Sequence, residues 1–327
     1  MKLPFFTPRQ KANGGEQTQN KKRNIVLTPS VVVLATYLLL LLSKIVDITV
    51  INRENEYYSV IILQLMIFLV PGAIWCRFNG ENYTKGLRLK APKLNSLLLI
   101  FSSAILMISG GLLISMLLGG LDSLSQNFSL YNTFISKTDG SIPSSLYLLA
   151  AYALIPAICE EFIFRGILCS EYETGGVFRS VVFSSLFFAM LHFNPVNILV
   201  YLFSGVILAL VLYASRSLFG AMIAHLLYNV FGLFGQPYMN TLYKITGSSN
   251  FFLFLVAFLF LLSGAVFCHE ASKLYKKHLY EGRSSSYRKP VITDPAKIRA
   301  SYISVLKEPA TIACFVFYIV ASIIYGI

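Results

Sequence analysis

Charged residues are scarce in this sequence: only 13% of its 327 residues are Asp, Glu, Lys or Arg, while 56% are hydrophobic. The mean hydropathy of +0.66 is too high for a soluble protein of this length. The composition therefore predicts a polytopic membrane protein. The net charge of +12 is spread over separate polar segments, which argues against a nucleic-acid partner and favours attraction to the lipid bilayer.

Several catalytic motifs are also missing. The sequence has no G-x-S-x-G and no H-E-x-x-H, which excludes a nucleophile elbow and the usual helix of a zinc protease. Its five cysteines form no C-x-x-C pair and lie in or beside apolar stretches, so we interpret them as packing residues. The sequence shows no repeat of fixed period.

Instead, the sequence has apolar stretches of about 20 residues, each long enough to cross a bilayer. We therefore predict an all-α, polytopic transmembrane helix bundle of about nine spans. Pro195 in "NPVN" divides the fifth stretch from the sixth. The nine stretches are 29–50, 57–76, 96–118, 145–168, 178–194, 196–214, 217–235, 251–268 and 311–326.

The basic residues predict the orientation in the membrane, because Lys and Arg favour cytoplasmic segments. Most of the 27 basic residues lie in 1–28, 77–93 and 269–310, which share one side of a nine-span bundle. We therefore expect a plasma-membrane protein with a cytoplasmic N-terminus. The first apolar stretch is too long for the core of a cleaved signal peptide and is expected to be a signal anchor.

Three charged residues interrupt the fourth apolar stretch, in "ICEEFIFRG". Glu161 and Arg165 are four residues apart on one helical face, a spacing that predicts an ion pair. Glu160 points about 100° away and needs another partner. A charge at the bilayer centre costs roughly 2.5–3.5 kcal/mol, so Glu160 is a candidate functional residue.

Two further polar pairs lie in the fifth and seventh stretches. "FFAMLHF" places Phe188 and His192 four residues apart, and "AHLLYNV" does the same for His225 and Asn229. Each His or Asn alone could join helices through a hydrogen bond. Together with Glu160 they could instead converge in one water-filled cavity.

Amide hydrolysis is the chemistry that such a cavity would suit. A desolvated carboxylate beside an imidazole can deprotonate water, and His and Asn donors can stabilise an oxyanion. Glu160, His192 and His225 could also hold Zn²⁺ with water as the fourth ligand, and the sequence does not decide between the two. Pro156 should bend or open the helix before Glu160, either to admit water or only to pack.

The motifs E-E-x-x-x-R, F-x-x-x-H and H-x-x-x-N, in this order, resemble the CPBP family over about residues 145–237. This family comprises intramembrane CAAX proteases and bacteriocin-processing or self-immunity proteins. The resemblance implies that Glu160 and His192 activate the hydrolytic water and that His225 and Asn229 form the oxyanion hole. It also implies supporting, structural roles for Glu161, Arg165 and Phe188.

The resemblance implies an intramembrane endopeptidase, metallo- or glutamate-dependent. It would cut a bond near the C-terminus of a prenylated CAAX-like protein or in a membrane-associated peptide. The alternative is a non-catalytic membrane scaffold that binds signalling or secretion proteins. A transporter that uses Glu160 as a proton carrier is a third hypothesis, against which the sequence shows no inverted repeat.

The predicted organisation follows from the spans and the resemblance. The segment 269–310 is basic and polar, includes "EGRSSSYRKP", and is predicted to be a flexible or interfacial loop. The predicted divisions are a basic cytoplasmic tail (1–28), N-terminal transmembrane helices (29–144), a CAAX-protease-like catalytic core (145–237), an additional transmembrane helix (238–268), the basic cytoplasmic segment (269–310) and a C-terminal transmembrane helix (311–327).

Overall fold

A computed structural model describes residues 28–49, 56–80, 83–119, 145–280 and 294–324. Within these ranges the chain forms helices and turns and no strand, which confirms the all-α class. The main helices are α1 (Ser30–Thr49), α2 (Glu56–Phe78), α3 (Leu97–Gly119), α6 (Ser145–Leu149), α7 (Ile155–Glu161), α8 (Cys169–Tyr172), α9 (Val177–Leu191), α10 (Ile198–Ser215), α11 (Leu218–Phe234), α12 (Gln236–Thr246), α13 (Ser249–Tyr280), α14 (Pro295–Leu306) and α15 (Pro309–Ile324).

A helix lies at each of the nine predicted apolar stretches. In the described ranges, five helical segments are long and apolar enough to cross a membrane, or six if the bent pair α14–α15 counts as one span. The apolar parts of α1, α9 and α11 are shorter. The helices are those of an integral membrane protein, whereas the count of nine and the orientation stay predictions.

Two sequence predictions need correction. The segment 269–310 is largely helical rather than a loop, because α13 continues to Tyr280 and α14 begins at Pro295. Asp294 caps α14 by accepting a hydrogen bond from the Ala296 N–H at 2.9 Å, and proline suits the first helical position. The range 238–268 is not one helix, since Gly247, with a φ of 61°, separates α12 from α13. The tail 1–27 and "EGRSSSYRKP" lie outside the described residues.

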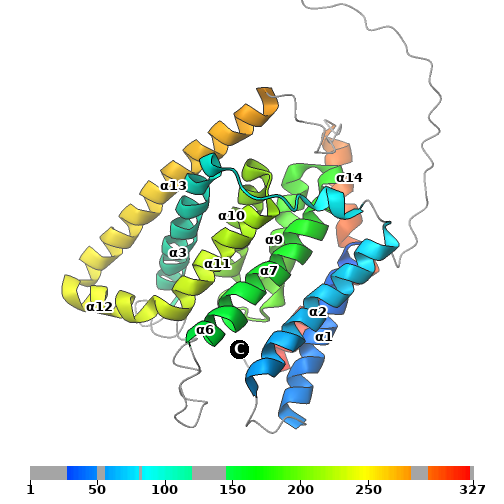
Figure 1. The fold of residues 1–327 in the computed structure, drawn as a ribbon, viewed down its shortest axis with the longest axis horizontal. Coiled ribbons are helices and arrows are strands. Elements are labelled where there is room, and N and C mark those ends of the chain that lie inside the picture. The colour runs from blue at the N-terminus through cyan, green and yellow to red at the C-terminus, as the bar shows by residue number, and fades with distance from the viewer. Residues whose placement is uncertain (1–27, 50–55, 81–82, 120–144, 281–293, 325–327) are drawn as a thin grey trace, which may run out of the picture.

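The helices form three groups in Figure 1. Helices α7, α9, α10 and α11 lie in the middle, α3 and α13 cover one side, and α1 and α2 cover the other. Helix α3 packs against α10, α11 and α13, while α2 packs against α7 and α1 packs against α15. The helices that carry the candidate polar residues are therefore enclosed by apolar neighbours.

The connection between α2 and α3 fixes where α11 begins. Its backbone carbonyl at Arg88 accepts a hydrogen bond from the Leu218 N–H at 2.9 Å, and the carbonyl of Lys90 accepts one from the Ser217 hydroxyl. The Arg88 side chain forms a buried ion pair with Glu173 at 2.5 Å. The two hydrogen bonds to backbone carbonyls hold the first turn of α11 and thereby set the position of the polar residues further along it.

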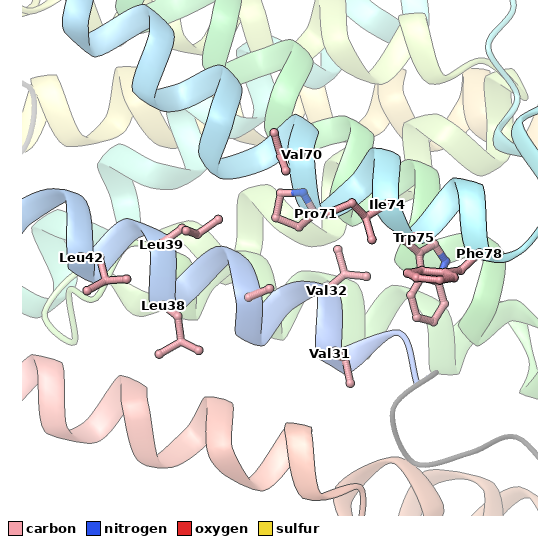
Figure 2. Close-up of a pocket in the computed structure, with 11 residues that line it drawn as sticks. Val31, Val32, Leu38, Leu39, Leu42, Val70, Pro71, Ile74, Trp75 and Phe78 are labelled. Carbon is pink, nitrogen blue, oxygen red and sulfur yellow. The ribbon is translucent and has the colours of Figure 1, made fainter.

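An apolar groove of about 750 Å³ runs along the outer face of α1 and α2. Figure 2 shows side chains of both helices lining it, among them Leu39, Pro71 and Phe78. None of its lining residues is ionisable, and Leu42 and Phe78 are exposed. The groove therefore belongs to the surface that a bilayer would cover, and it offers no group for acid–base chemistry.

Helices α9 and α10 approach each other closely at Gly205. A Cβ at this position would lie 3.0 Å from the Ser185 Cα and 3.2 Å from its carbonyl oxygen. These are backbone atoms of a packed helix, so neither can move aside easily. Gly205 is therefore required for the separation of the two helices.

We predict that Gly205→Ala destabilises the protein and lowers the midpoint of thermal unfolding in detergent. Alanine gains roughly 0.5–1 kcal/mol over glycine inside a helix, but overpacking costs roughly 1–3 kcal/mol. Gly264→Ala in α13 is the matched control, because its Cβ would meet the nearest atom at an ordinary 3.6 Å. A midpoint for Gly205→Ala equal to or above that of the control would contradict the close approach.

Candidate active site

The fourth apolar stretch is not a uniform α-helix. Its backbone is π-helical at Ala150–Leu154 and again at Phe162–Leu168, with α7 between these two segments. Pro156 lies two residues after the end of the first π-helical segment, which confirms the predicted local opening of the helix. Short π-helical insertions are common at functional sites, and here they flank Glu160 and Glu161.

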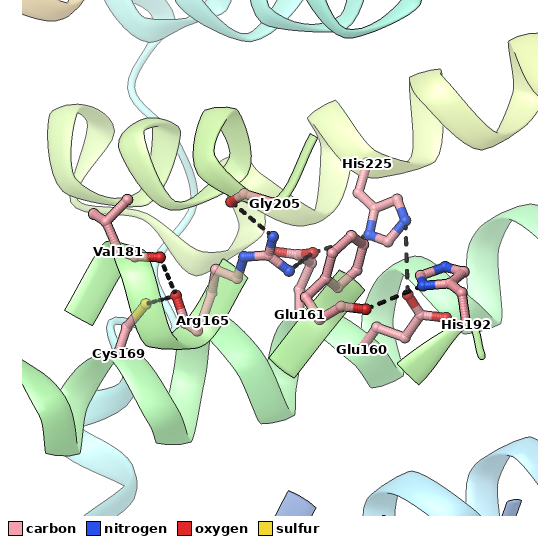
Figure 3. A network of polar contacts seen from close by, with 10 residues as sticks. Glu160, Glu161, Arg165, Cys169, Val181, His192, Gly205 and His225 are labelled. Atoms are coloured by element: carbon pink, nitrogen blue, oxygen red, sulfur yellow. Dashed lines mark hydrogen bonds and ion pairs between the residues drawn. The ribbon is translucent and has the colours of Figure 1, made fainter. Parts of the chain in front are cut away.

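The predicted ion pair between Glu161 and Arg165 is present and fully buried. Arg165 Nη1 lies 2.7 Å from Glu161 Oε1, and neither side chain is exposed. Arg165 Nη2 also donates to the Gly205 carbonyl at 3.0 Å, and its guanidinium lies 4.4 Å from the centre of the Phe188 ring. Arg165 thus connects its own segment to α10 and α9, as Figure 3 shows for Gly205.

Glu161 has a second partner that the sequence did not predict. Its Oε1 accepts a hydrogen bond from His225 Nδ1 at 2.9 Å. Because a carboxylate only accepts, His225 carries a proton on Nδ1. His225 Nε2 then lies 3.9 Å from Glu160 Oε2, so Glu161 orients this imidazole toward Glu160 (Figure 3).

His192 lies immediately after α9, as its C-terminal cap. Its Nδ1 lies 3.0 Å from the Phe188 carbonyl oxygen, an atom that can only accept a hydrogen bond. The ring stacks on Tyr201 of α10, with centroids 3.8 Å apart and planes 11° apart. The imidazole is therefore held on two sides, and its Nε2 carries the lone pair.

Glu160, His192, His225 and Asn229 line a single cavity of about 390 Å³. The convergence predicted from three separate stretches is therefore found. Asn229 makes only a long contact inside it, from Nδ2 to the Ala153 carbonyl at 3.4 Å. Its amide N–H groups remain close to the cavity.

Like the Ser204 hydroxyl in the same cavity, Glu160 carries a buried oxygen, Oε2, that has no hydrogen-bond partner among the described residues. Buried carboxylate oxygens are normally hydrogen-bonded. A water molecule or a substrate group in the cavity would satisfy this oxygen.

A metal site at Glu160, His192 and His225 is not formed in this arrangement. In the ranges that the structure describes, no group of three His, Cys, Asp or Glu side chains is placed to hold a metal ion. The Zn²⁺ site stays a prediction from the sequence.

Polar residues near Glu160 that the sequence did not single out include Tyr201, Ser204 and Gln64. Tyr201 and Ser204 line the same cavity, and they share a face of α10 because they are three residues apart. Gln64 of α2 approaches Glu160 from the opposite side. It is the only amide side chain in the stretch 57–76, a signal that could have identified it.

We expect Arg165→Met to destabilise the protein by about 3–5 kcal/mol, because it leaves the Glu161 carboxylate buried without its cation. The double variant Glu161→Gln/Arg165→Met should recover part of this loss. Lys273→Met is the control, since Lys273 pairs with Glu270 at 3.1 Å but is 58% exposed, and exposed pairs contribute about 0–1 kcal/mol. Equal thermal unfolding midpoints for Arg165→Met and Lys273→Met would contradict the structural role of Arg165.

The region that contains the cavity matches a known protein family. Residues 142–231 match the family described as Type II CAAX prenyl endopeptidase Rce1-like. Searches of the curated proteins and of the solved structures gave no match. The matched residues include Glu160, His192, His225 and Asn229, and the family is one of peptidases. The match confirms the resemblance seen in the motifs: residues 142–231 are similar to the CAAX-type intramembrane proteases.

Proposed function

We propose that the protein hydrolyses a peptide bond of a membrane-associated protein or peptide by means of a water molecule activated by Glu160 and His192. The observation that carries this proposal is the single cavity lined by Glu160, His192, His225 and Asn229. A carboxylate, two imidazoles and an amide are the groups that water activation and oxyanion stabilisation require.

In the proposed reaction, Glu160 is the general base. The water oxygen attacks the carbonyl carbon of the substrate while one water proton passes to the Glu160 carboxylate. The C–N bond then breaks as Glu160 returns this proton to the leaving nitrogen. His192 Nε2, which has the lone pair, accepts a hydrogen bond from the remaining water hydrogen and orients the attack.

The oxyanion would be stabilised from α11. Asn229 can donate from its amide nitrogen. The proton of His225 on Nδ1 is already donated to Glu161, so Nε2 can donate to the oxyanion only when His225 is an imidazolium. The Glu161 carboxylate would stabilise that positive charge throughout, and the Glu160 carboxylate would do so until it takes up the water proton.

The proposed substrates include proteins with a prenylated CAAX-like C-terminus as well as membrane-associated peptides. The proposed location is the plasma membrane with the N-terminus in the cytoplasm, because the basic residues gather in segments that would share that side. A membrane-embedded cavity would favour substrates that are themselves held at the bilayer.

Glu160→Gln should abolish proteolysis while leaving the amount of protein unchanged, because the amide has nearly the same shape but is not a base. We expect a loss of about 10²–10⁴-fold. The measurement is mass spectrometry of new protein termini in cells that express wild type or variant at matched levels. Glu270→Gln in α13, outside the cavity, is the control.

Termini that appear with wild type and Glu270→Gln but not with Glu160→Gln would establish proteolysis. Their sequences would show whether a CAAX-like C-terminus or another peptide is cut. Identical termini for all three proteins, with equal rescue of a deletion phenotype, would overturn the protease proposal. That result would favour the scaffold hypothesis.

Removal of divalent metal should leave the cleavage rate unchanged, because Glu160 and His192 activate the water without a metal in the proposed reaction. Purified protein in detergent is dialysed against EDTA and assayed on a peptide that spans a cleavage site found in the experiment above. A zinc protease treated in parallel is the control for metal removal. Loss of activity that Zn²⁺ restores would contradict the metal-independent reaction.

A further inference from the structure

A second cavity, of about 210 Å³, lies on the other side of Glu160. It shares Pro156, Glu160 and His192 with the larger cavity. Its remaining wall comes from three helices: Leu40 from α1, Gln64 and Phe68 from α2, and Leu191 from α9. Glu160 and His192 therefore stand between two spaces, one toward α10 and α11 and one toward α1 and α2.

Among the described residues, the second cavity is apolar apart from Glu160, His192 and one further side chain. That side chain belongs to Gln64. The Oε1 atom of Gln64 is buried and accepts no hydrogen bond from the residues described. Buried polar atoms are paired in the great majority of cases, so an unpaired carboxamide oxygen beside the reacting carboxylate requires an explanation.

An extended substrate would supply the missing partner. If the peptide bond is cut beside Glu160, the chain on either side of that bond must continue into the space next to it. Within a membrane, each backbone N–H needs an acceptor in the protein. Because the second cavity is otherwise apolar, Gln64 is the acceptor it offers in addition to Glu160 and His192.

We propose that Gln64 positions the substrate by accepting a hydrogen bond from the backbone N–H of a substrate residue in the second cavity. The side chain of that residue would be apolar, since it would contact Leu40, Phe68 and Leu191. This inference rests on the proposed proteolysis and adds to it a residue of α2, which lies outside the matched range 142–231.

The test compares wild type with Gln64→Leu, which keeps the approximate volume of the side chain and removes the acceptor. Met66→Leu is the matched control, because Met66 lies on the same helix and is 51% exposed. The substrate is a synthetic peptide that spans the most abundant terminus produced by wild type but not by Glu160→Gln. A second set of peptides replaces each backbone amide near the cut by an ester, which removes one N–H without adding bulk.

For Gln64→Leu we expect KM to rise about 3- to 10-fold while kcat changes little, because a hydrogen bond made equally in the bound and transition states affects binding alone. One ester peptide should show the same rise with wild type. That same ester should show no further rise with Gln64→Leu. Met66→Leu should behave as wild type on every peptide.

Three other results would contradict the proposal, and each would contradict a different part of it. If wild type produces no termini that depend on Glu160, the proposed proteolysis fails, and the role of Gln64 fails with it. If proteolysis is present but Gln64→Leu has the KM of wild type, only the role of Gln64 is wrong. A fall in kcat with an unchanged KM, or equal ester effects in both proteins, would show that Gln64 is structural and does not contact substrate.

Discussion

The Glu161 carboxylate is the group on which the arrangement of the site depends. One of its oxygens contacts both Arg165 and His225, at 2.7 Å and 2.9 Å. Arg165 extends this connection to the Gly205 carbonyl on α10 and to the Phe188 ring on α9. A charge that is buried away from water needs a partner of opposite charge. The requirement to pair Glu161 therefore holds four helical segments together around Glu160.

In this network the two adjacent carboxylates, Glu160 and Glu161, have different roles. Glu161 is buried completely and contacts Arg165 and His225, whereas Glu160 lines both cavities. Neighbouring residues of a helix point about 100° apart, so one short segment supplies a structural carboxylate and a reactive one. The surrounding π-helical turns widen the backbone on both sides of this pair.

The spacing of residues along the sequence predicted the contacts within one helix. It did not predict which residues of different helices contact each other. The pair Glu161–Arg165 follows from a separation of four residues, and the polar residues of three stretches indicated a common cavity. The contact between Glu161 and His225 joins residues 64 positions apart, and spacing does not determine such contacts. Gln64 was missed for the same reason. Hydropathy located the nine apolar stretches but not the C-terminal end of α13, because a helix of good helix formers continues past its apolar part.

The start of α11 is held by the backbone of the α2–α3 connection rather than by its side chains. The Leu218 N–H and the Ser217 hydroxyl both bond to backbone carbonyls, those of Arg88 and Lys90. A backbone carbonyl is present whatever residue occupies position 90, so substitutions of Lys90 would preserve the hydrogen bond to Ser217. A change in the number of residues would move both carbonyls and, with them, His225 and Asn229. In related proteins, this connection should vary more readily in sequence than in length.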